Sequence, residues 1–229
     1  MGLVIFDIDG TLVSGLSTEK RFFLRLAHTG NQGPRQLLAY LAFLVRWSGL
    51  YGRDVLKKNK AYLTLLSSAK VRRLAAEWVP SNFDGIAFRP CVERLRNHLA
   101  NGDEVVLVSG TPDFLAAGIA ETLGVAHAIG SRCAERAGRF RFGRPLLHPF
   151  GRTKLSIAQE LCEHYGVSLD QVTAYADTRH DLPLLEAVGT PVAVRPDDRL
   201  AAVARDRGWE IIGTRARRRG SLARPCSPS

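Results

Sequence analysis

The sequence predicts an α/β protein in which a doubly wound, Rossmann-like parallel sheet carries an α-helical cap inserted after the first strand. Short apolar segments alternate with helix-length segments over residues 86–213, a pattern typical of parallel sheets covered by helices on both faces. Residues 15–85 show helical patterns only. We therefore expect a core formed by residues 1–14 and 86–213, and a helical cap formed by residues 15–85.

The expected core elements follow the apolar runs and the residues that interrupt them. The first strand, 3–6, is wholly apolar and stops at an acidic residue, and the Val-rich segment 104–108 is the next strand after the cap. Ala137-Gly138 predicts the turn of a hairpin within 131–142. The other expected strands are 126–129, 172–176, 191–194 and 210–212, and the expected helices are 90–100, 112–123, 153–165, 182–188 and 199–207.

Four helices are expected in the cap, because apolar residues recur there at helical spacing between glycine-rich breaks. Pro34 suits the first turn of one of them, since its ring fixes the backbone angle that a helix needs. That helix contains an apolar run, 37–45, which is far shorter than a segment that spans a bilayer. The expected cap helices are 18–28, 34–47, 53–66 and 68–78.

The composition is typical of a soluble globular protein: of 229 residues, 45% are hydrophobic and 24% are charged. No targeting signal precedes the first strand. The four cysteines show no metal-binding or redox spacing. We therefore expect reduced cysteines and a cytoplasmic location.

The net charge of +10 is uneven, because residues 214–229 hold five arginines and no acidic residue. Their Gly, Ser and Pro content predicts a disordered basic tail. Such a tail can bind nucleic acid or anionic lipid, although a solvated tail with no specific nucleic-acid partner is the favoured interpretation. A protein that binds nucleic acid through this tail is the non-enzymatic alternative.

Polar residues follow the first expected strand, at the edge where a parallel sheet binds ligands. The strand ends at Asp7, and Asp9 and Gly10 follow. Side chains alternate along a strand, so the two carboxylates can share a site only where the strand stops between them, and Gly10 favours such a break. The pair suggests a divalent-cation site or a nucleophile beside an acid; a plain turn is the alternative.

The other strand ends carry groups of matching chemistry. Ser109-Gly110-Thr111 combines a hydroxyl, a glycine that allows close approach and a helix N-terminus, which together favour an anion such as phosphate. Lys154 opens a later helix and can reach a phosphate as a point charge. Asp177 and Asp181 follow another strand, and two further carboxylates fit a hard cation with oxygen ligands.

These motifs, in this order, resemble those of the haloacid dehalogenase superfamily, and most closely its phosphoserine phosphatase-like branch. The resemblance is carried by Asp7-Ile8-Asp9-Gly10-Thr11, by 109–111, by Lys154 and by 177–181. It covers residues 3–212 and is stronger after Phe88 than in the cap. It implies a Mg²⁺-dependent phosphatase that hydrolyses a phosphomonoester through an aspartyl-phosphate intermediate.

The resemblance implies separate roles for the two leading aspartates. Asp7 would be the nucleophile, while Asp9 would protonate the leaving oxygen and then activate water. A carboxylate at Asp9 favours a phosphatase over a dehalogenase, because a departing halide needs no proton.

The resemblance also implies a metal site and a phosphate site. The expected Mg²⁺ ligands are Asp7, the backbone carbonyl of Asp9, and Asp177. Asp181 would orient a metal-bound water or Lys154. The expected phosphoryl ligands are Ser109, the Gly110 amide and Lys154.

Two residues depart from the family pattern. Ala176 stands where a glycine usually precedes the aspartate, and His180 stands where phosphoserine phosphatases often have asparagine. We expect His180 to neighbour the site, where its pKa could place a charge change near neutral pH.

The cap is expected to select the substrate, a small phosphorylated metabolite or a lipid phosphate. A phosphoserine-type substrate needs a cation for its carboxylate and an acid for its amine, for which Arg53 and Glu19 are candidates. The apolar helix 36–47 is interpreted as buried within the cap, and a membrane-contacting helix is the alternative. A phosphotransferase is a further alternative, because its first half-reaction is the same.

Overall fold

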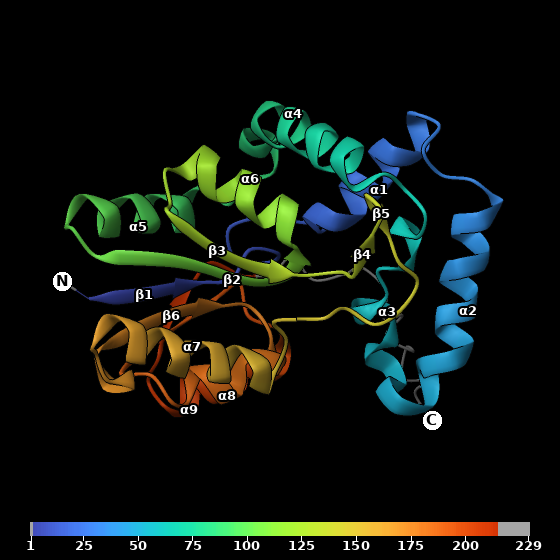
Figure 1. Ribbon diagram of the computed structural model, residues 1–229. Helices are drawn as coiled ribbons and strands as arrows, with labels where there is room; N and C mark the ends of the chain where they lie inside the picture. Colours follow the sequence, from blue (N-terminus) through green and yellow to red (C-terminus); the bar gives the residue numbers. More distant parts are fainter. Residues whose placement is uncertain (1, 215–229) are drawn as a thin grey trace, which may run out of the picture.

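A computed structural model describes residues 2–214, without the Arg53 side chain, and contains one six-stranded parallel sheet (Figure 1). Its strands are β1 (Leu3–Phe6), β2 (Glu104–Pro112), β3 (His127–Ser131), β6 (Val172–Ala176), β7 (Thr190–Val194) and β8 (Glu210–Ile212). They lie in the order β3-β2-β1-β6-β7-β8. The strand order reverses beside β1, which confirms the doubly wound sheet and places ligand binding at the carboxyl ends of β1 and its neighbours.

The two faces of the sheet bury different residues, as the alternation of side chains along a strand requires. Val4 and Phe6 pack on one face with helices α4, α5 and α6, whereas Leu3 and Ile5 pack on the other face with α7, α8 and α9 (Figure 1). These helices span Ser68–Ile86 (α4), Arg89–Ala100 (α5), Asp113–Leu123 (α6), Arg152–Tyr165 (α7), Leu182–Leu185 (α8) and Asp198–Asp206 (α9).

The remaining elements lie beyond the carboxyl ends of the strands (Figure 1). They are α1 (Thr18–His28), α2 (Pro34–Tyr51), α3 (Val55–Lys58) and the hairpin of β4 (Glu135–Arg136) and β5 (Arg139–Phe140), with the expected turn at Ala137-Gly138. Two single 3-10 turns, Gly52–Asp54 and Ala61–Leu63, flank α3. These elements are therefore placed to cover the edge of the sheet at which the polar motifs end.

The expected single helix over 53–66 is wrong, because tertiary contacts break it at Asn59 and Lys60. Asn59 has an extended backbone, with ψ at 106°. Its side chain donates to the Tyr40 carbonyl oxygen over 3.1 Å and accepts from the Ala61 amide over 2.9 Å. Lys60 is buried against Glu19. A buried ion pair and a side chain that bonds locally to the backbone outweigh helical propensity here.

The interpretation of helix 36–47 as buried is also wrong. Of the 18 residues in α2, Gln36 and Phe43 alone are buried. Phe43 packs with Val55 and Ala61, so one side of the helix is anchored. The opposite side faces solvent, because no further layer of described residues covers it.

Helix α4 continues to Ile86, beyond the expected end at residue 78 and through Pro80. Its Val79 packs closely on α6, where a Cβ added at Gly118 would lie 3.4 Å from Val79 Cβ. This helix therefore packs against the core even though it belongs to the segment assigned to the cap. The division between cap and core after residue 85 stays a prediction.

Several expectations about the chain concern features other than the sheet. Cys91, Cys133 and Cys162 are free thiols, as expected for the described part of the chain. Among residues 2–214, none of the helices has the length and hydropathy needed to cross a membrane. The tail predicted for 214–229 lies outside the described residues, apart from Thr214.

Gly130 of β3 lies against the turn that joins β2 to α6. A Cβ at this position would lie 2.5 Å from Asp113 Cα and 2.8 Å from the Thr111 carbonyl oxygen. Both neighbours are backbone atoms, so a side chain here would displace the strand end that carries the expected phosphate-binding residues.

We expect Gly130→Ala to lower the free energy of unfolding by about 1–3 kcal/mol, a typical cost of overpacking. Gly85→Ala is the matched control, since Gly85 lies in α4 and a Cβ there meets no atom within 4 Å. Alanine is favoured over glycine in helices by about 1 kcal/mol, so the control should melt at the same or a higher temperature. Circular dichroism measures both transitions; an unchanged melting temperature for Gly130→Ala would contradict the expected clash.

Candidate active site

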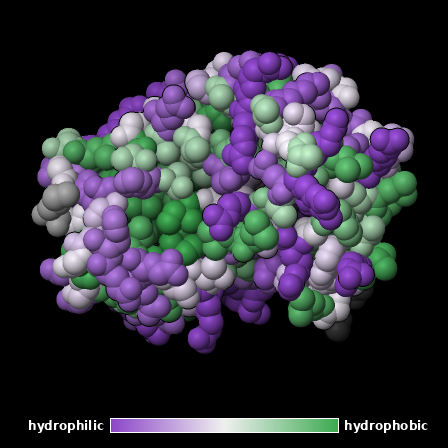
Figure 2. Space-filling view, viewed as in Figure 1, coloured by the Kyte–Doolittle hydropathy of each residue, from purple (hydrophilic) through white to green (hydrophobic). Residues whose placement is uncertain are grey.

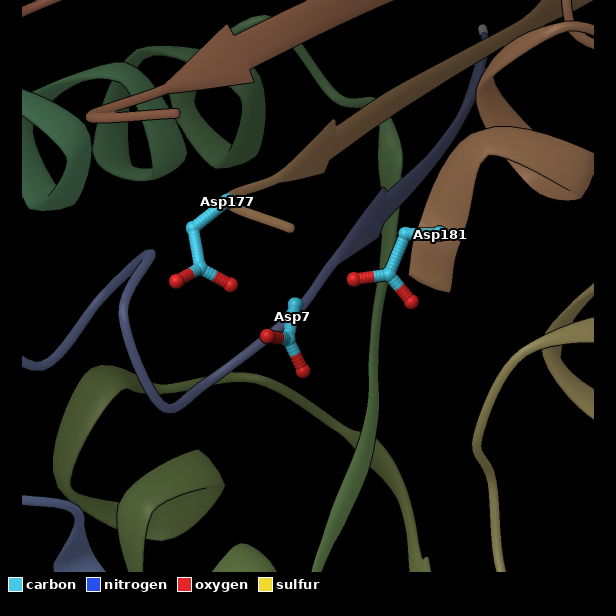
Figure 3. A group of neighbouring side chains, drawn as sticks. All are labelled: Asp7, Asp177 and Asp181. Carbon is cyan, nitrogen blue, oxygen red and sulfur yellow. The ribbon is translucent and has the colours of Figure 1, made fainter. Parts of the chain in front are cut away.

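Three carboxylates meet at the carboxyl ends of the two central strands. Asp7 follows β1, Asp177 follows β6, and Asp181 ends the short 3-10 turn Arg179–Asp181. One oxygen of each carboxylate lies within 4.8 Å of the others, and all three residues are buried (Figure 3). Because β1 and β6 are paired in parallel, residues that directly follow these strands emerge side by side.

Lys154 lies between two of these carboxylates. Its Nζ, on the first turn of α7, is 2.9 Å from Asp7 Oδ1 and 2.9 Å from Asp181 Oδ1. Burial alone would lower the pKa of Lys154, but Asp181 and Asp7 raise the pKa above its usual range, so the side chain stays an ammonium. Burial raises the pKa of Asp7, and Lys154 opposes that rise.

Gly10 lets Asp177 approach the loop after β1. Its φ of +98° lies in a region that disfavours any side chain. A Cβ at Gly10 would also collide with the Asp177 carboxylate. This glycine therefore meets two requirements: it turns the chain between Asp7 and the residues that follow, and it leaves room for Asp177.

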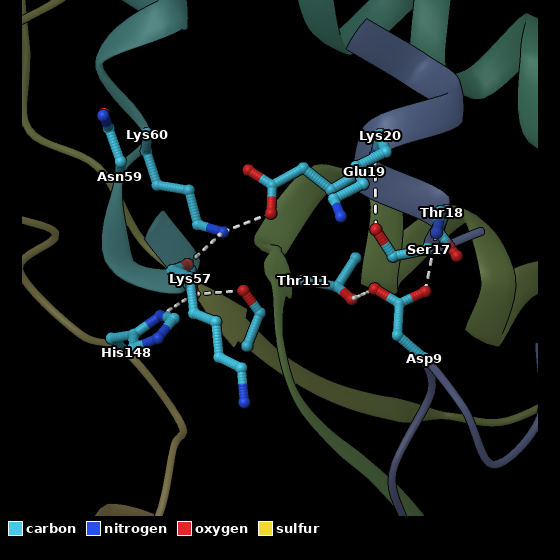
Figure 4. A network of polar contacts seen from close by, with 12 residues as sticks. Asp9, Ser17, Thr18, Glu19, Lys20, Lys57, Asn59, Lys60, Thr111 and His148 are labelled. Carbon is cyan, nitrogen blue, oxygen red and sulfur yellow. Dashed lines mark hydrogen bonds and ion pairs between the residues drawn. The ribbon is translucent and has the colours of Figure 1, made fainter. Parts of the chain in front are cut away.

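The side chain of Asp9 is held by hydrogen bonds from two threonines. Its Oδ1 accepts from the Thr18 amide at the start of α1 over 2.6 Å, and its Oδ2 accepts from Thr111 Oγ1 over 2.8 Å (Figure 4). Burial raises the pKa of Asp9, while the bonds from Thr18 and Thr111 oppose that rise. The expected metal contact of Asp9 uses its backbone carbonyl, and it stays a prediction.

Ser109 and Gly110 belong to β2, which runs four residues past its expected end at 108. Ser109 and Thr111 are buried, and their hydroxyl oxygens lie 3.2 Å apart. A hydrogen bond from Ser109 also opposes the rise in the pKa of Asp7. Ser109 is therefore placed in one polar cluster with Asp7 and Lys154.

Sequence analysis missed Ser131 and His148, which lie beside Gly110. Ser131 Oγ is 2.6 Å from the Gly110 carbonyl oxygen and 2.6 Å from His148 Nδ1. A carbonyl can only accept, so the one hydroxyl hydrogen goes to Gly110, and His148 donates from Nδ1. Burial and four surrounding lysines lower the pKa of His148 to about 3, so the ring is neutral. Neither residue stands near a motif, and only the fold brings them to Gly110.

Glu19, the expected partner of a substrate amine, pairs with Lys60, which sequence analysis also missed. Lys60 Nζ contacts Glu19 Oε2 (Figure 4). Burial raises the pKa of Glu19, and Lys60 opposes that rise. Glu19 Oε1 has no hydrogen-bond partner among the described residues. Arg53, the expected partner of a substrate carboxylate, lies outside the described side chains.

A cavity of about 760 Å³ joins these groups. One end is lined by the polar cluster of Asp7, Ser109 and Lys154, and the walls beyond it come from α1, α2 and α3. His180 lies beside this cavity, with its ring centroid 4.6 Å from that of the cavity-lining Phe150. Burial and Lys57 lower the pKa of His180.

The donor set at the strand ends fits a hard divalent cation. The three carboxylates provide oxygen atoms, which Mg²⁺ prefers. Together with Lys154, these residues form a group of three carboxylates and one ammonium. A dication would offset this excess, which is costly to bury.

The chain matches known proteins over most of its length. Residues 4–186 match the haloacid dehalogenase-like hydrolase family. Phosphoserine phosphatase SerB1 of Mycobacterium tuberculosis is 34% identical over 225 residues, which cover 94% of this chain and 72% of that protein. Histidinol-phosphatase of Neisseria meningitidis is 31% identical, with 92% of this chain and 97% of that protein covered.

A solved structure has a similar fold. A crystal structure of a protein of unknown function from Bordetella pertussis has a TM-score of 0.77 and 28% identity, covering 92% of this chain and 97% of that one. The family match, the relatives and the fold agree with the order of the motifs. The chain therefore belongs to the haloacid dehalogenase-like hydrolase family and is an enzyme similar to that family's phosphoserine phosphatase-like phosphatases.

Proposed function

We propose that this protein is a Mg²⁺-dependent phosphatase that hydrolyses a phosphomonoester through an aspartyl-phosphate on Asp7. The observation that carries the proposal is the buried Asp7 carboxylate, held 2.9 Å from Lys154 at the polar end of a large cavity. Phosphoryl transfer needs a nucleophile, cations that bind the phosphoryl oxygens, and an acid within reach of the leaving oxygen. The names of the relatives differ in substrate, so they do not select one for this chain.

The proposed reaction has two steps on the same pair of aspartates. An Asp7 oxygen forms a bond to phosphorus as the bond to the leaving oxygen breaks, and Asp9 gives its proton to that oxygen. Water then attacks phosphorus, Asp9 takes a proton from it, and Asp7 is released as a carboxylate. The raised pKa of Asp9 suits a residue that must hold a proton before the first step.

The other residues of the site hold charge in place during transfer. Lys154, Ser109 and the Gly110 amide would bind the phosphoryl oxygens, where negative charge is stabilised in the transition state. Mg²⁺ would be held by Asp7, Asp177 and the backbone carbonyl of Asp9, and would supply positive charge to the phosphoryl group. Asp181 would keep Lys154 in position through their contact.

A phosphotransferase shares the first step and differs in the acceptor, which would be a hydroxyl in place of water. No contact among the described residues favours a second hydroxyl over water. Hydrolysis is therefore the function proposed.

Asp7→Asn should reduce phosphate release by several orders of magnitude, because an amide cannot act as the nucleophile. The assay is Mg²⁺-dependent phosphate release from phosphoserine, histidinol phosphate, sugar phosphates and an aryl phosphate. Asp84→Asn is the control, since Asp84 is an exposed carboxylate on α4. Acid-quenched wild type should retain labelled phosphate that Asp7→Asn does not. Equal activity of the Asp7 variant on every ester would overturn the proposal.

Asp9→Asn should slow poor leaving groups much more than good ones, because only a poor leaving group needs a proton. The comparison is kcat/KM for an alkyl phosphate and for a nitrophenyl phosphate, each divided by the wild-type value. We expect the alkyl ester to lose at least about tenfold more activity than the aryl ester. An equal loss on both esters would mean that Asp9 acts through structure and does not supply the proton.

Mg²⁺ should raise the melting temperature of the wild type, since a ligand that binds only the folded state stabilises it. Asp177→Asn should weaken this effect by removing one carboxylate of the three. A Mg²⁺-induced shift of equal size in the variant would exclude Asp177 as a ligand.

A further inference from the structure

Exposed apolar side chains are concentrated in and around α1, α2 and α3. Of the thirteen large apolar side chains that are exposed among the described residues, Ile211 alone belongs to the main sheet. Nine lie between residues 16 and 56, in and around α1, α2 and α3. These nine are Leu16, Phe23, Leu24, Leu37, Leu38, Leu41, Val45, Leu50 and Leu56.

Helix α2 presents the longest part of this surface. Leu37, Leu41 and Val45 recur every four residues and therefore lie along one side of the helix, with Leu38 beside them. The exposed fraction is 60% for Leu37, 48% for Leu41, 83% for Val45 and 66% for Leu38. We call these four residues the outer stripe of α2. Figure 2 shows hydrophobic side chains at the right-hand edge of the molecule, where α2 lies.

The segment that contains the outer stripe is strongly basic. Residues 15–60 contain nine lysines and arginines against two acidic residues, a net charge of +7. Helix α2 has no acidic residue, and its Arg35 and Arg46 are exposed. An apolar stripe with basic neighbours is complementary to an anionic membrane surface. A second copy of the chain on the same stripe would instead bring two basic surfaces together.

The cavity opens next to the outer stripe. Leu37 belongs to the stripe and also lines the cavity. The exposed Phe23 and Leu56, on neighbouring helices, line the cavity too. Glu19, a half-buried carboxylate that lines the cavity on α1, already faces Lys60. Phe23, Leu37 and Leu56 can therefore contact an apolar group of a ligand whose phosphate lies at the strand ends, beside the lysines that also line the cavity.

We propose that the outer stripe of α2 binds an anionic lipid membrane, and that the substrate is a phosphomonoester with an apolar tail that enters the cavity from that membrane. The part about membrane binding is independent of catalysis, whereas the part about the substrate rests on the proposed function. The helix lies on the surface with its apolar side inward and its arginines at the level of the headgroups.

The membrane part is tested by co-flotation with vesicles and no substrate. The probes are vesicles of phosphatidylcholine, alone or mixed with anionic phosphatidylglycerol. Wild type should float with the mixed vesicles, and Leu41→Glu/Val45→Glu should lose at least tenfold in apparent affinity. The matched control is Arg96→Glu, which changes the net charge by the same two units at an exposed position of α5, on the opposite end of the molecule (Figure 1). It should bind like wild type.

Three results would overturn the membrane part. The first is no flotation of wild type with anionic vesicles, and the second is equal flotation of wild type and the double variant. The third is a dimer in sedimentation velocity that the double variant abolishes, without vesicle binding, which would assign the stripe to a second copy. Circular-dichroism melting of the variants separates loss of binding from loss of fold, because both replaced side chains are exposed.

The substrate part is tested by phosphate release from lysophosphatidic acid in the mixed vesicles and from glycerol 3-phosphate in solution. We expect kcat/KM at least tenfold higher for the lipid, and a loss of that preference in the double variant. Turnover of glycerol 3-phosphate with no preference for the lipid would overturn this inference and leave the phosphatase proposal standing. Vesicle binding without phosphate release from any ester would instead overturn the phosphatase proposal and leave the membrane surface standing.

Discussion

The contact on which the site depends is the Lys154 ammonium between the buried carboxylates of Asp7 and Asp181, at 2.9 Å from each. Charges removed from water are tolerated when they are paired, and removal of one partner from a buried pair typically costs about 3–5 kcal/mol. Lys154 links three separate parts of the chain: the end of β1, the start of α7 and the turn after β6. The parallel pairing of β1 with β6 adds Asp177 to the same place, so the excess negative charge of the cluster follows directly from the topology of the sheet.

Helix α1 contacts the proposed acid, Asp9, through a backbone amide. Asp9 accepts a hydrogen bond from the Thr18 amide, at the N-terminus of α1, where free backbone amides and the helix dipole favour a carboxylate. Its other oxygen is held by Thr111 from β2. The proposed acid is therefore fixed jointly by the first helix after the strand and by the sheet. A displacement of α1 would change the position and the pKa of Asp9. The position of α1 over the cavity and the acidity of Asp9 are therefore coupled through Thr18.

The sequence predicted what depends on local pattern and failed where distant residues decide. The apolar runs located all six strands of the sheet, the strand ends located Asp7, Ser109 and Asp177, and a helix start located Lys154. The break of 53–66 depends on Lys60, whose partner Glu19 lies 41 residues away. His148 lies against Gly110, and Ser131 bridges the two, although 38 residues separate them in the sequence. The exposure of α2 could not be predicted, because an apolar run gives no information about which of its sides another element covers.

The Glu19–Lys60 pair reduces the negative charge that the cavity offers to a positively charged substrate group. An isolated buried carboxylate would attract an ammonium group strongly, since the cost of its burial would otherwise be unmet. Lys60 meets part of that cost through Glu19 Oε2, so a substrate amine would have to compete with a cation that the protein itself supplies. Selectivity for an ammonium is weakened by this arrangement, whereas the apolar contacts of Phe23, Leu37 and Leu56 have no internal competitor of this kind. The proposed apolar leaving group would therefore meet these contacts without displacing the Glu19–Lys60 pair.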